Sequence, residues 1–278
     1  MSDYDFILDD FLWSFSSLES FHNCKYGWFL NYINRTKSRS SAFSDYGSWC
    51  HKLLEEYLKG EKFDFELEDA FKNGYSNKVV NQFPPVRGTK LYDKYYEQGC
   101  KYFSSITQLE KLSSNKILGV EHKHIFYIDK YKFTGVLDVE GQDKNGNYII
   151  VDHKSKSKQD VIKPKRKENP DDFIKLTDGR LVPRHLFTQQ YLYCIPFKEQ
   201  YGEYPKYLNL NVFRISDWYQ IEFNEKDFER AKQWALETIH DIYNETEWKP
   251  TCTGSDFFCD WLCSFCENCK YCDKYLGD

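Results

Sequence analysis

The stretch FTGVLDVEGQDKNGNYIIVDHKSKS, residues 133 to 157, decides the fold. Two runs rich in β-branched and aromatic residues flank a turn signal, Lys144, Asn145 and Gly146, which predicts a β-hairpin. If these three residues form the loop, with Gly146 in the left-handed conformation, Asp138 and Asp152 face each other across the two strands. A two-residue loop at Asn145 and Gly146 would shift the register by one and separate the two carboxylates.

Side chains alternate along a strand, so Lys154 shares the face of the two aspartates while His153 points the other way. Residues 148 to 151 are apolar on both faces, which indicates a buried central strand where uncompensated charge is costly. Two opposed carboxylates repel each other, and a divalent cation relieves the repulsion. The alternative is an exposed cross-strand salt bridge between aspartate and lysine.

The rest of the chain predicts a single α/β domain over residues 1–278, without repeats or low-complexity linkers. Helices are expected over 14–33, with Ser16 and Glu19 as capping box, over 47–60, over 184–197 with Pro196 as the stop, and over 224–243 with Asn224 as N-cap. A helical insert is expected over about 61–112. Strands are expected over 117–128, 130–142, 147–155 and 206–215.

The net charge of −5 excludes a broad cationic coat for nucleic acid, so any DNA contact must be local. The one basic segment follows the hairpin and contains Lys154, Lys156, Lys158, Lys163, Lys165, Arg166 and Lys167. By itself this segment could equally be a solvated loop. No stretch has the ~20 apolar residues of a membrane span, and the N-terminus lacks signal-peptide order, so a cytoplasmic location is expected.

The C-terminal segment FFCDWLCSFCENCKYC carries five of the ten cysteines. Crowded thiolates in a reducing compartment are reactive unless they are ligated, so this density indicates a metal centre. Short cysteine spacings also describe zinc ribbons, and Zn²⁺ is therefore one candidate.

An aspartate on one strand followed by Asp-x-Lys on the next, here Asp138 with Asp152 and Lys154, resembles the PD-(D/E)xK nuclease signature. The resemblance implies a restriction-endonuclease-like core (helix-strand-strand-strand-helix-strand) with helical additions. It implies that Asp138 and Asp152 bind Mg²⁺ or Mn²⁺ together with the backbone carbonyl of His153, and that Lys154 assists the attacking water. The outward direction expected for His153 suits that carbonyl role.

Two further motifs resemble the RecB-like branch of this superfamily. Gly47 and His51 match its Gly-x-x-x-His, which implies that His51 completes the metal site. Gln189 and Tyr193 match its Gln-x-x-x-Tyr on the helix after the lysine strand. Because residues four apart share a helix face, this amide and phenol can both point at a nucleotide.

AddB-like and CRISPR-adaptation nucleases hold a 4Fe-4S cluster with one N-terminal and three C-terminal cysteines. Residues 17 to 24 resemble the lead-in to the first, Cys24, although Lys25 stands where proline is frequent. A phage-type spacing implies that the tail ligands are Cys259, Cys263 and Cys269; the other spacing in the family uses Cys263, Cys266 and Cys272. Such a cluster would tie the segment around residue 24 to residues 259–272 and so act as a staple for the fold.

Together the resemblance implies a metal-dependent DNA nuclease, an exonuclease acting on single strands or DNA ends, with the basic segment from Lys156 to Lys167 on the DNA backbone. No GxxxxGK[ST] motif occurs, so the protein is expected to work alone, with a separate helicase, or with a recombination or CRISPR-adaptation protein. A phage-encoded chain would act in the host cytoplasm. The alternative is a noncatalytic DNA-binding or assembly protein with a structural cysteine centre and a degenerate nuclease site.

Overall fold

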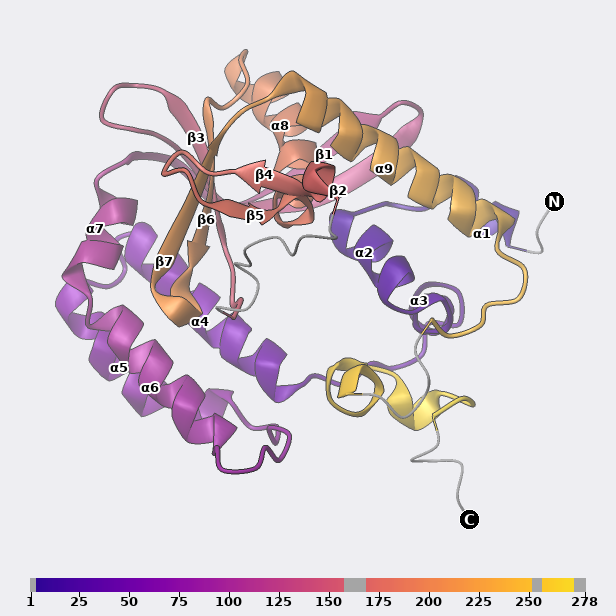
Figure 1. Cartoon of the computed structure of the whole chain (residues 1–278), viewed down its shortest axis with the longest axis horizontal. Helices are drawn as coiled ribbons and strands as arrows, with labels where there is room; N and C mark the ends of the chain where they lie inside the picture. The colour runs from indigo at the N-terminus through magenta and orange to yellow at the C-terminus, as the bar shows by residue number, and fades with distance from the viewer. Residues whose placement is uncertain (1–3, 158–168, 252–256, 273–278) are drawn as a thin grey trace.

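A mixed five-stranded sheet lies at the centre of the computed structural model, which describes residues 4–157, 169–251 and 257–272 (Figure 1). Its strands are β1 (Lys116–Ile128), β2 (Tyr131–Gln142), β3 (Tyr148–His153), β6 (Tyr207–Val212) and β7 (Asp217–Glu222). The order is β1-β2-β3-β6-β7, and only β3 and β6 are parallel. A parallel pair needs a crossover, which the helix α8 (Thr188–Tyr201) supplies.

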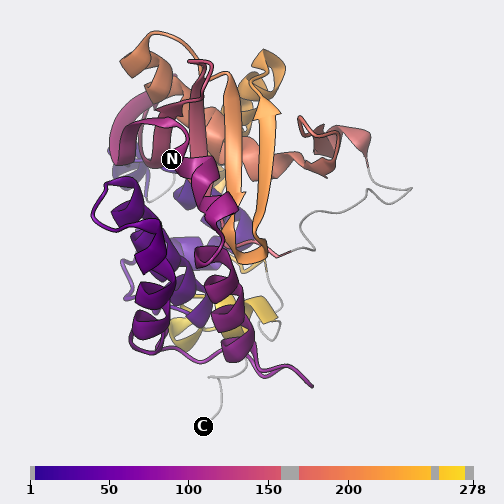
Figure 2. The same ribbon diagram turned by 90° about the vertical axis from the view of Figure 1, so that its left-hand side faces the viewer.

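Helices cover both faces of the sheet. One apolar core joins the sheet to α8, α9 (Glu225–Asn244) and the N-terminal helices, and the other joins it to the helices that follow residue 41. Figure 1 shows α8 and α9 on one side and α4 on the other, and Figure 2 faces α5 to α7 with β6 and β7 side by side at the edge. The remaining helices are α1 (Asp5–Asp9), α2 (Phe15–Asn23), α3 (Lys25–Tyr32), α4 (Ala42–Leu58), α5 (Asp64–Lys78), α6 (Leu91–Phe103) and α7 (Ile106–Ser113).

The predicted mixed α/β architecture is confirmed, including three consecutive antiparallel strands, a helical insert before them and Asn224 as the N-cap of α9. The sequence pattern predicts no element for residues 156 to 183, the polar stretch before α8. It contains a small two-stranded sheet, β4 (Phe173–Lys175) with β5 (Leu181–Pro183), too short to give a periodic signal.

The first predicted helix is wrong in one respect, because Cys24 divides it into α2 and α3. Cys24 is extended (φ −162°, ψ 109°), closes α2 and serves as the N-cap of α3. The capping box of α2 is formed by Ser14 and Ser17, not by Ser16 and Glu19. The helical periodicity of the apolar side chains continues across the break, which is why the sequence pattern hid it.

Three other boundaries also differ from the prediction. Helix α8 does not stop at Pro196 but continues to Tyr201 and ends at the left-handed Gly202, because burial of Phe197 outweighs the hydrogen bond that proline removes. The strand predicted to residue 215 ends at Val212, and a turn with left-handed Ser216 leads into β7, which was not predicted. Helix α4 starts at Ala42 rather than near 47, with Ser41 as its cap.

None of the helices within the described part of the chain combines the length and apolar composition that crossing a membrane requires.

Candidate active site

The β2–β3 hairpin has the loop that the sequence predicts. The backbone N–H of Asp143 donates to the carbonyl of Asn147 (2.9 Å), and Gly146 between them has φ +79°. Asp143 Oδ1 accepts from the N–H of Asn147 (2.9 Å), which stiffens the turn. Val139 pairs with Val151 in the ladder that follows, so the next position places Asp138 opposite Asp152. The alternative register is therefore excluded.

The side-chain alternation of β2 breaks at Asp138. Leu137 lies in the core on the α8 side of the sheet, yet Val139 lies in the core on the α4 side, although residues two apart normally share a face. Glu121, which stands opposite on β1, has φ +52° and interrupts the ladder between the pairs Val120–Val139 and His122–Leu137, and the register shifts again between Ile117 and Gly119. This irregularity directs the Asp138 carboxylate toward α4.

Helix α4 supplies His51 to the same place. His51 Nδ1 lies 3.6 Å from Asp138 Oδ2 and 3.9 Å from Glu121 Oε1. One ligand atom from each of these residues lies within 4.8 Å of the other two. A Cβ on Gly47, one turn earlier on α4, would meet nothing within 4 Å, so the helix leaves open space beside the histidine.

Lys154 contacts both Asp152 and the Gln-x-x-x-Tyr motif of α8. Lys154 Nζ donates to Asp152 Oδ1 (3.1 Å) and to Gln189 Oε1 (2.7 Å), and Gln189 Nε2 donates to the Tyr193 hydroxyl (3.1 Å). Gly135 on β2 makes room for this helix, because a Cβ there would lie 2.3 Å from the Tyr193 ring. The predicted lysine, glutamine and tyrosine thus form one hydrogen-bonded chain.

Burial and neighbouring charges shift the pKa values of several groups in this site. Burial, and then the negative charge of Asp152, raise the pKa of Asp138 to about 7. Burial lowers the pKa of His51, but Glu121 and Asp138 raise it by more. Burial also lowers the pKa of Lys154, yet the charges of Asp152 and Asp138 raise it overall, so this lysine remains a cation.

The side chain of His153 leaves β3 on the face opposite to Lys154, as strand alternation predicts, and its ring meets the ring of His51 edge-on at 5.6 Å between centroids. The backbone N–H of His153 donates to Asp138 Oδ2 (2.7 Å), while its Nδ1 lies 3.0 Å from Asn211 Nδ2 on β6. Burial, followed by the charges of His51 and Lys154, lowers the pKa of the His153 ring well below its ordinary value, so the ring is neutral. Only the backbone of His153 faces the carboxylates.

These residues fit a hard divalent cation. Asp152 Oδ2 lies 2.9 Å from Lys154 Nζ, but it is buried and accepts no hydrogen bond from any described residue with acceptable geometry. His51, Glu121 and Asp138 each offer one ligand atom within 4.8 Å of the others, and Asp152 stands opposite Asp138 on β3. Carboxylate oxygens and one imidazole are ligands that Mg²⁺ and Mn²⁺ accept.

Glu121 is the residue of this site that the sequence analysis missed. The turn between β1 and β2 points to Glu121. Asp129 and Lys130 form this two-residue turn, so Ile128 pairs with Tyr131, and this pair sets the register of the two strands. The same register argument that pairs Asp138 with Asp152 would have placed Glu121 opposite Asp138.

Comparison with known families agrees with this geometry. The model of the PD-(D/E)XK nuclease superfamily matches residues 12–273, which is most of the chain. The chain belongs to this superfamily. The match spans both the β2–β3 hairpin and the cysteine-rich segment.

A solved structure from Eubacterium rectale, provisionally named an exonuclease, is similar to this superfamily member at 13% identity. The alignment covers 98% of this chain and 90% of the other, with a TM-score of 0.49. No curated protein matches the chain.

A small cleft of about 150 Å³ leads to the lysine side of the site in this superfamily member. It is lined by Phe15, Glu19, Lys154, Lys156, His185, Leu186 and Gln189. Lys156, one of the basic residues predicted to contact DNA, therefore lines the same cleft as Lys154. The others, Lys158, Lys163, Lys165, Arg166 and Lys167, fall outside the described residues.

The cysteine-rich segment lies against the N-terminal helices, below α3 in Figure 1. The Arg39 N–H donates to the carbonyl of Ser264 (3.0 Å), and the ring of Tyr26 meets that of Tyr271 edge-on at 5.0 Å. Cys24 and Cys259 are both buried, and Cys266 and Cys272 are joined in a disulfide.

Two cysteine sulfurs of this region accept backbone hydrogen bonds. The N–H of Gly27 donates to Cys24 Sγ (3.3 Å), and the N–H of Phe265 donates to Cys263 Sγ (3.4 Å). Such bonds stabilise a sulfur that carries negative charge, as a metal-ligating thiolate does.

Proposed function

We propose that this chain is a Mg²⁺- or Mn²⁺-dependent deoxyribonuclease of the RecB-like branch, an exonuclease that hydrolyses phosphodiester bonds in single-stranded DNA or at DNA ends. The observation that carries the proposal is the grouping of His51, Glu121 and Asp138 within ligand distance of one another, with Asp152 opposite Asp138 on the next strand and paired with Lys154. The salt bridge between Asp152 and Lys154 alone does not explain the site, because Asp138 and Glu121 lie beside His51 instead.

In this proposal His51, Glu121, Asp138 and Asp152 hold the cation, with the His153 carbonyl as a further ligand. A cation held by these residues would supply Lewis-acid chemistry at the scissile phosphate and would lower the pKa of water. The N–H of His153 donates to Asp138 (2.7 Å) and fixes the orientation of that carboxylate.

Lys154 acts as a fixed positive charge and not as a general base, because its neighbours Asp152 and Asp138 raise its pKa. It positions the attacking water and stabilises the negative charge that develops on the phosphate. Gln189 holds the ammonium group through a 2.7 Å hydrogen bond, and with Tyr193 it guides the DNA strand.

The proposed DNA path runs through the cleft beside Lys154. The cleft brings Lys154 and Lys156 to one wall, where a strand backbone could lie. Lys156 would contact the backbone there, and the basic residues that follow it would extend this contact, which gives binding a strong salt dependence.

We further propose a 4Fe-4S cluster bound by Cys24, Cys259, Cys263 and Cys269. Its support is the packing of the two segments against each other and the hydrogen bonds to the Cys24 and Cys263 sulfurs, and Cys266 and Cys272 are the alternative tail ligands. The cluster would tie both ends of a single nuclease domain, residues 1–278. Zn²⁺ at the same cysteines is the competing outcome.

The chain carries no nucleotide-binding GxxxxGK[ST] motif, so we propose that a separate helicase or a recombination or CRISPR-adaptation protein delivers its DNA.

The test is cleavage of end-labelled and circular single-stranded DNA with Mg²⁺, with Mn²⁺ and with chelator, for the wild type and Asp152→Ala. We expect metal-dependent degradation of the linear substrate alone, and none with Asp152→Ala. The exposed Asp241→Asn is the matched control and should remain active. DNA binding without any cleavage would identify a noncatalytic binding protein, and cleavage of circles would identify an endonuclease.

A further inference from the structure

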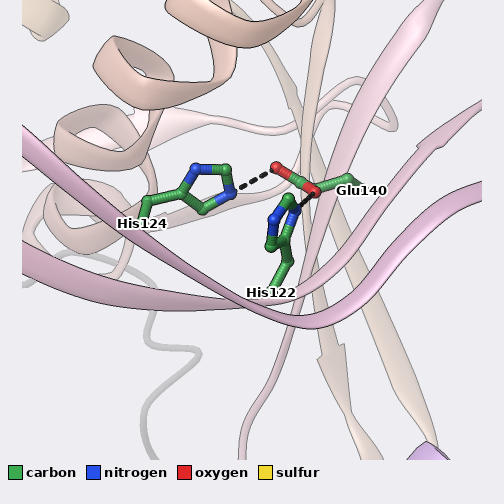
Figure 3. A group of neighbouring side chains, drawn as sticks. All are labelled: His122, His124 and Glu140. Carbon is green, nitrogen blue, oxygen red and sulfur yellow. Dashed lines mark hydrogen bonds and ion pairs between the residues drawn. The ribbon is translucent and has the colours of Figure 1, made fainter.

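Strands β1 and β2 carry a second group of ligand-type side chains, His122, His124 and Glu140 (Figure 3). His122 Nδ1 lies 2.8 Å from Glu140 Oε2, and His124 Nε2 lies 2.8 Å from Glu140 Oε1. The two imidazole rings are 4.3 Å apart between centroids. All three residues point into one place, as Figure 3 shows, and one ligand atom from each lies within 4.8 Å of the others.

The group is separate from the candidate active site although the two adjoin in sequence. Glu121 faces α4 with Asp138, whereas the next residue, His122, pairs with Leu137, whose side chain lies in the core on the α8 side. The Tyr201 hydroxyl of α8 donates to Glu140 Oε2 (3.3 Å), which places the cluster on that face. No residue of the proposed nuclease mechanism belongs to it.

The backbone around the group is shaped to admit the carboxylate. A Cβ on Gly119 would lie 2.4 Å from Glu140 Oε2 and 3.4 Å from His122 Nδ1, so only glycine leaves room there. The Glu140 side chain has no exposed surface, His124 is 8% exposed and His122 is 42% exposed. A fully buried carboxylate needs a compensating cation, and two imidazolium rings this close would repel each other.

We propose that His122, His124 and Glu140 form a second metal site, which binds Zn²⁺ and is distinct from the Mg²⁺ or Mn²⁺ site. Two imidazoles and one carboxylate are a ligand set that zinc prefers and that Mg²⁺, which takes oxygen ligands, does not. The fourth position would open to solvent on the side of the half-exposed His122.

The distances are compatible with a bound ion. Ligands at about 2.0–2.2 Å from a tetrahedral zinc lie roughly 3.4 Å from one another. The two N···O distances of 2.8 Å would therefore lengthen by about half an ångström as each ring exchanges a hydrogen bond for a metal bond. The exposure of His122 permits this movement, and the Tyr201 hydroxyl keeps one carboxylate oxygen oriented.

The experiment measures zinc content and not activity. Metal-free full-length protein is equilibrated with Zn²⁺ in excess Mg²⁺, freed of unbound metal and analysed for zinc per chain. We compare the wild type with His122→Ala and His124→Ala, and use His240→Ala, a 78% exposed histidine on α9, as the matched control. Gly119→Ala tests the site without removing a ligand.

We expect the His122→Ala, His124→Ala and Gly119→Ala proteins each to lose one zinc per chain relative to the wild type and to His240→Ala. Asp152→Ala should keep that zinc, so the outcome does not depend on the nuclease proposal. Crystals of the zinc-loaded wild type should give an anomalous peak between the three side chains, which decides the matter even if a variant fails to fold. Equal zinc content in all variants, or no peak at this position, would show that the group is a hydrogen-bonded network only.

Discussion

Replacing Asp138 by asparagine should stabilise the metal-free protein at alkaline pH. Burial and the charge of Asp152 raise the pKa of Asp138 from 3.8 to about 7, so ionising this group in the folded chain is costly. Asparagine has nearly the same shape, and its amide oxygen still accepts from the N–H of His153, but it carries no charge. The substitution therefore removes the repulsion and keeps the hydrogen bond.

The sign and size of the effect follow from the two pKa values. Between pH 3.8 and about 7 the unfolded chain has lost the Asp138 proton while the folded chain retains it, so the free energy of unfolding of the wild type falls as pH rises. The full cost above pH 7 is on the order of 4 kcal/mol for a rise of roughly three pKa units. The advantage of Asp138→Asn should grow by roughly 2 to 3 kcal/mol between pH 5 and pH 8.

Urea denaturation in chelator at these two pH values measures this difference. Asp241→Asn, at an exposed position on α9, is the matched control and should change stability by less than ~0.5 kcal/mol at either pH. Added Mg²⁺ should stabilise the wild type and should affect Asp138→Asn much less, since binding to the folded state alone raises stability. A variant that is less stable than the wild type at pH 8, or whose advantage does not depend on pH, would refute the reasoning.

Four other substitutions test separate parts of the chain. Asp152→Ala should abolish Mn²⁺ binding, measured by calorimetry, with an unchanged circular dichroism spectrum. Lys154→Ala should reduce the single-turnover rate by a factor of 10² or more and leave DNA affinity within a few fold, because its charge acts on the transition state; a loss mainly of affinity would contradict this. Cys24→Ser should lose iron and lower Tm, and full iron content would remove Cys24 from the cluster. Gly135→Ala should cost about 1–3 kcal/mol in urea denaturation, because its Cβ would meet the Tyr193 ring at 2.3 Å; an unchanged midpoint would show that the ring moves away freely.

The part of the site that the sequence predicted depends on local turn chemistry. A left-handed glycine at 146 sets the loop length, and the loop length sets the register that opposes Asp138 and Asp152. The same reasoning applied to the β1–β2 turn would have reached Glu121, and it would also have placed Gly119 beside Glu140. These residues were accessible from the sequence but carry no motif that draws attention to them.

Other features depend on tertiary contacts and could not be predicted locally. The extended conformation of Cys24 leaves the helical spacing of its neighbours unchanged. Helix α8 continues past Pro196 because its C-terminal part buries Phe197. Intrinsic helix propensity does not include the free energy of this burial. Strict alternation along β2 would place Val139 in the core on the α8 side with Leu137. Val139 instead lies in the core on the α4 side, because the backbone changes face at Asp138.

The position of β1 at the edge of the sheet bears on the dynamics of both proposed metal sites. An edge strand is held by one neighbour only, and its opening is among the least costly local fluctuations of a sheet. Because β1 carries Glu121 as well as His122 and His124, a single opening event would dismantle both ligand sets at once. Occupancy of either site would then slow amide hydrogen exchange along β1 and favour occupancy of the other, a coupling that needs no change in the average structure.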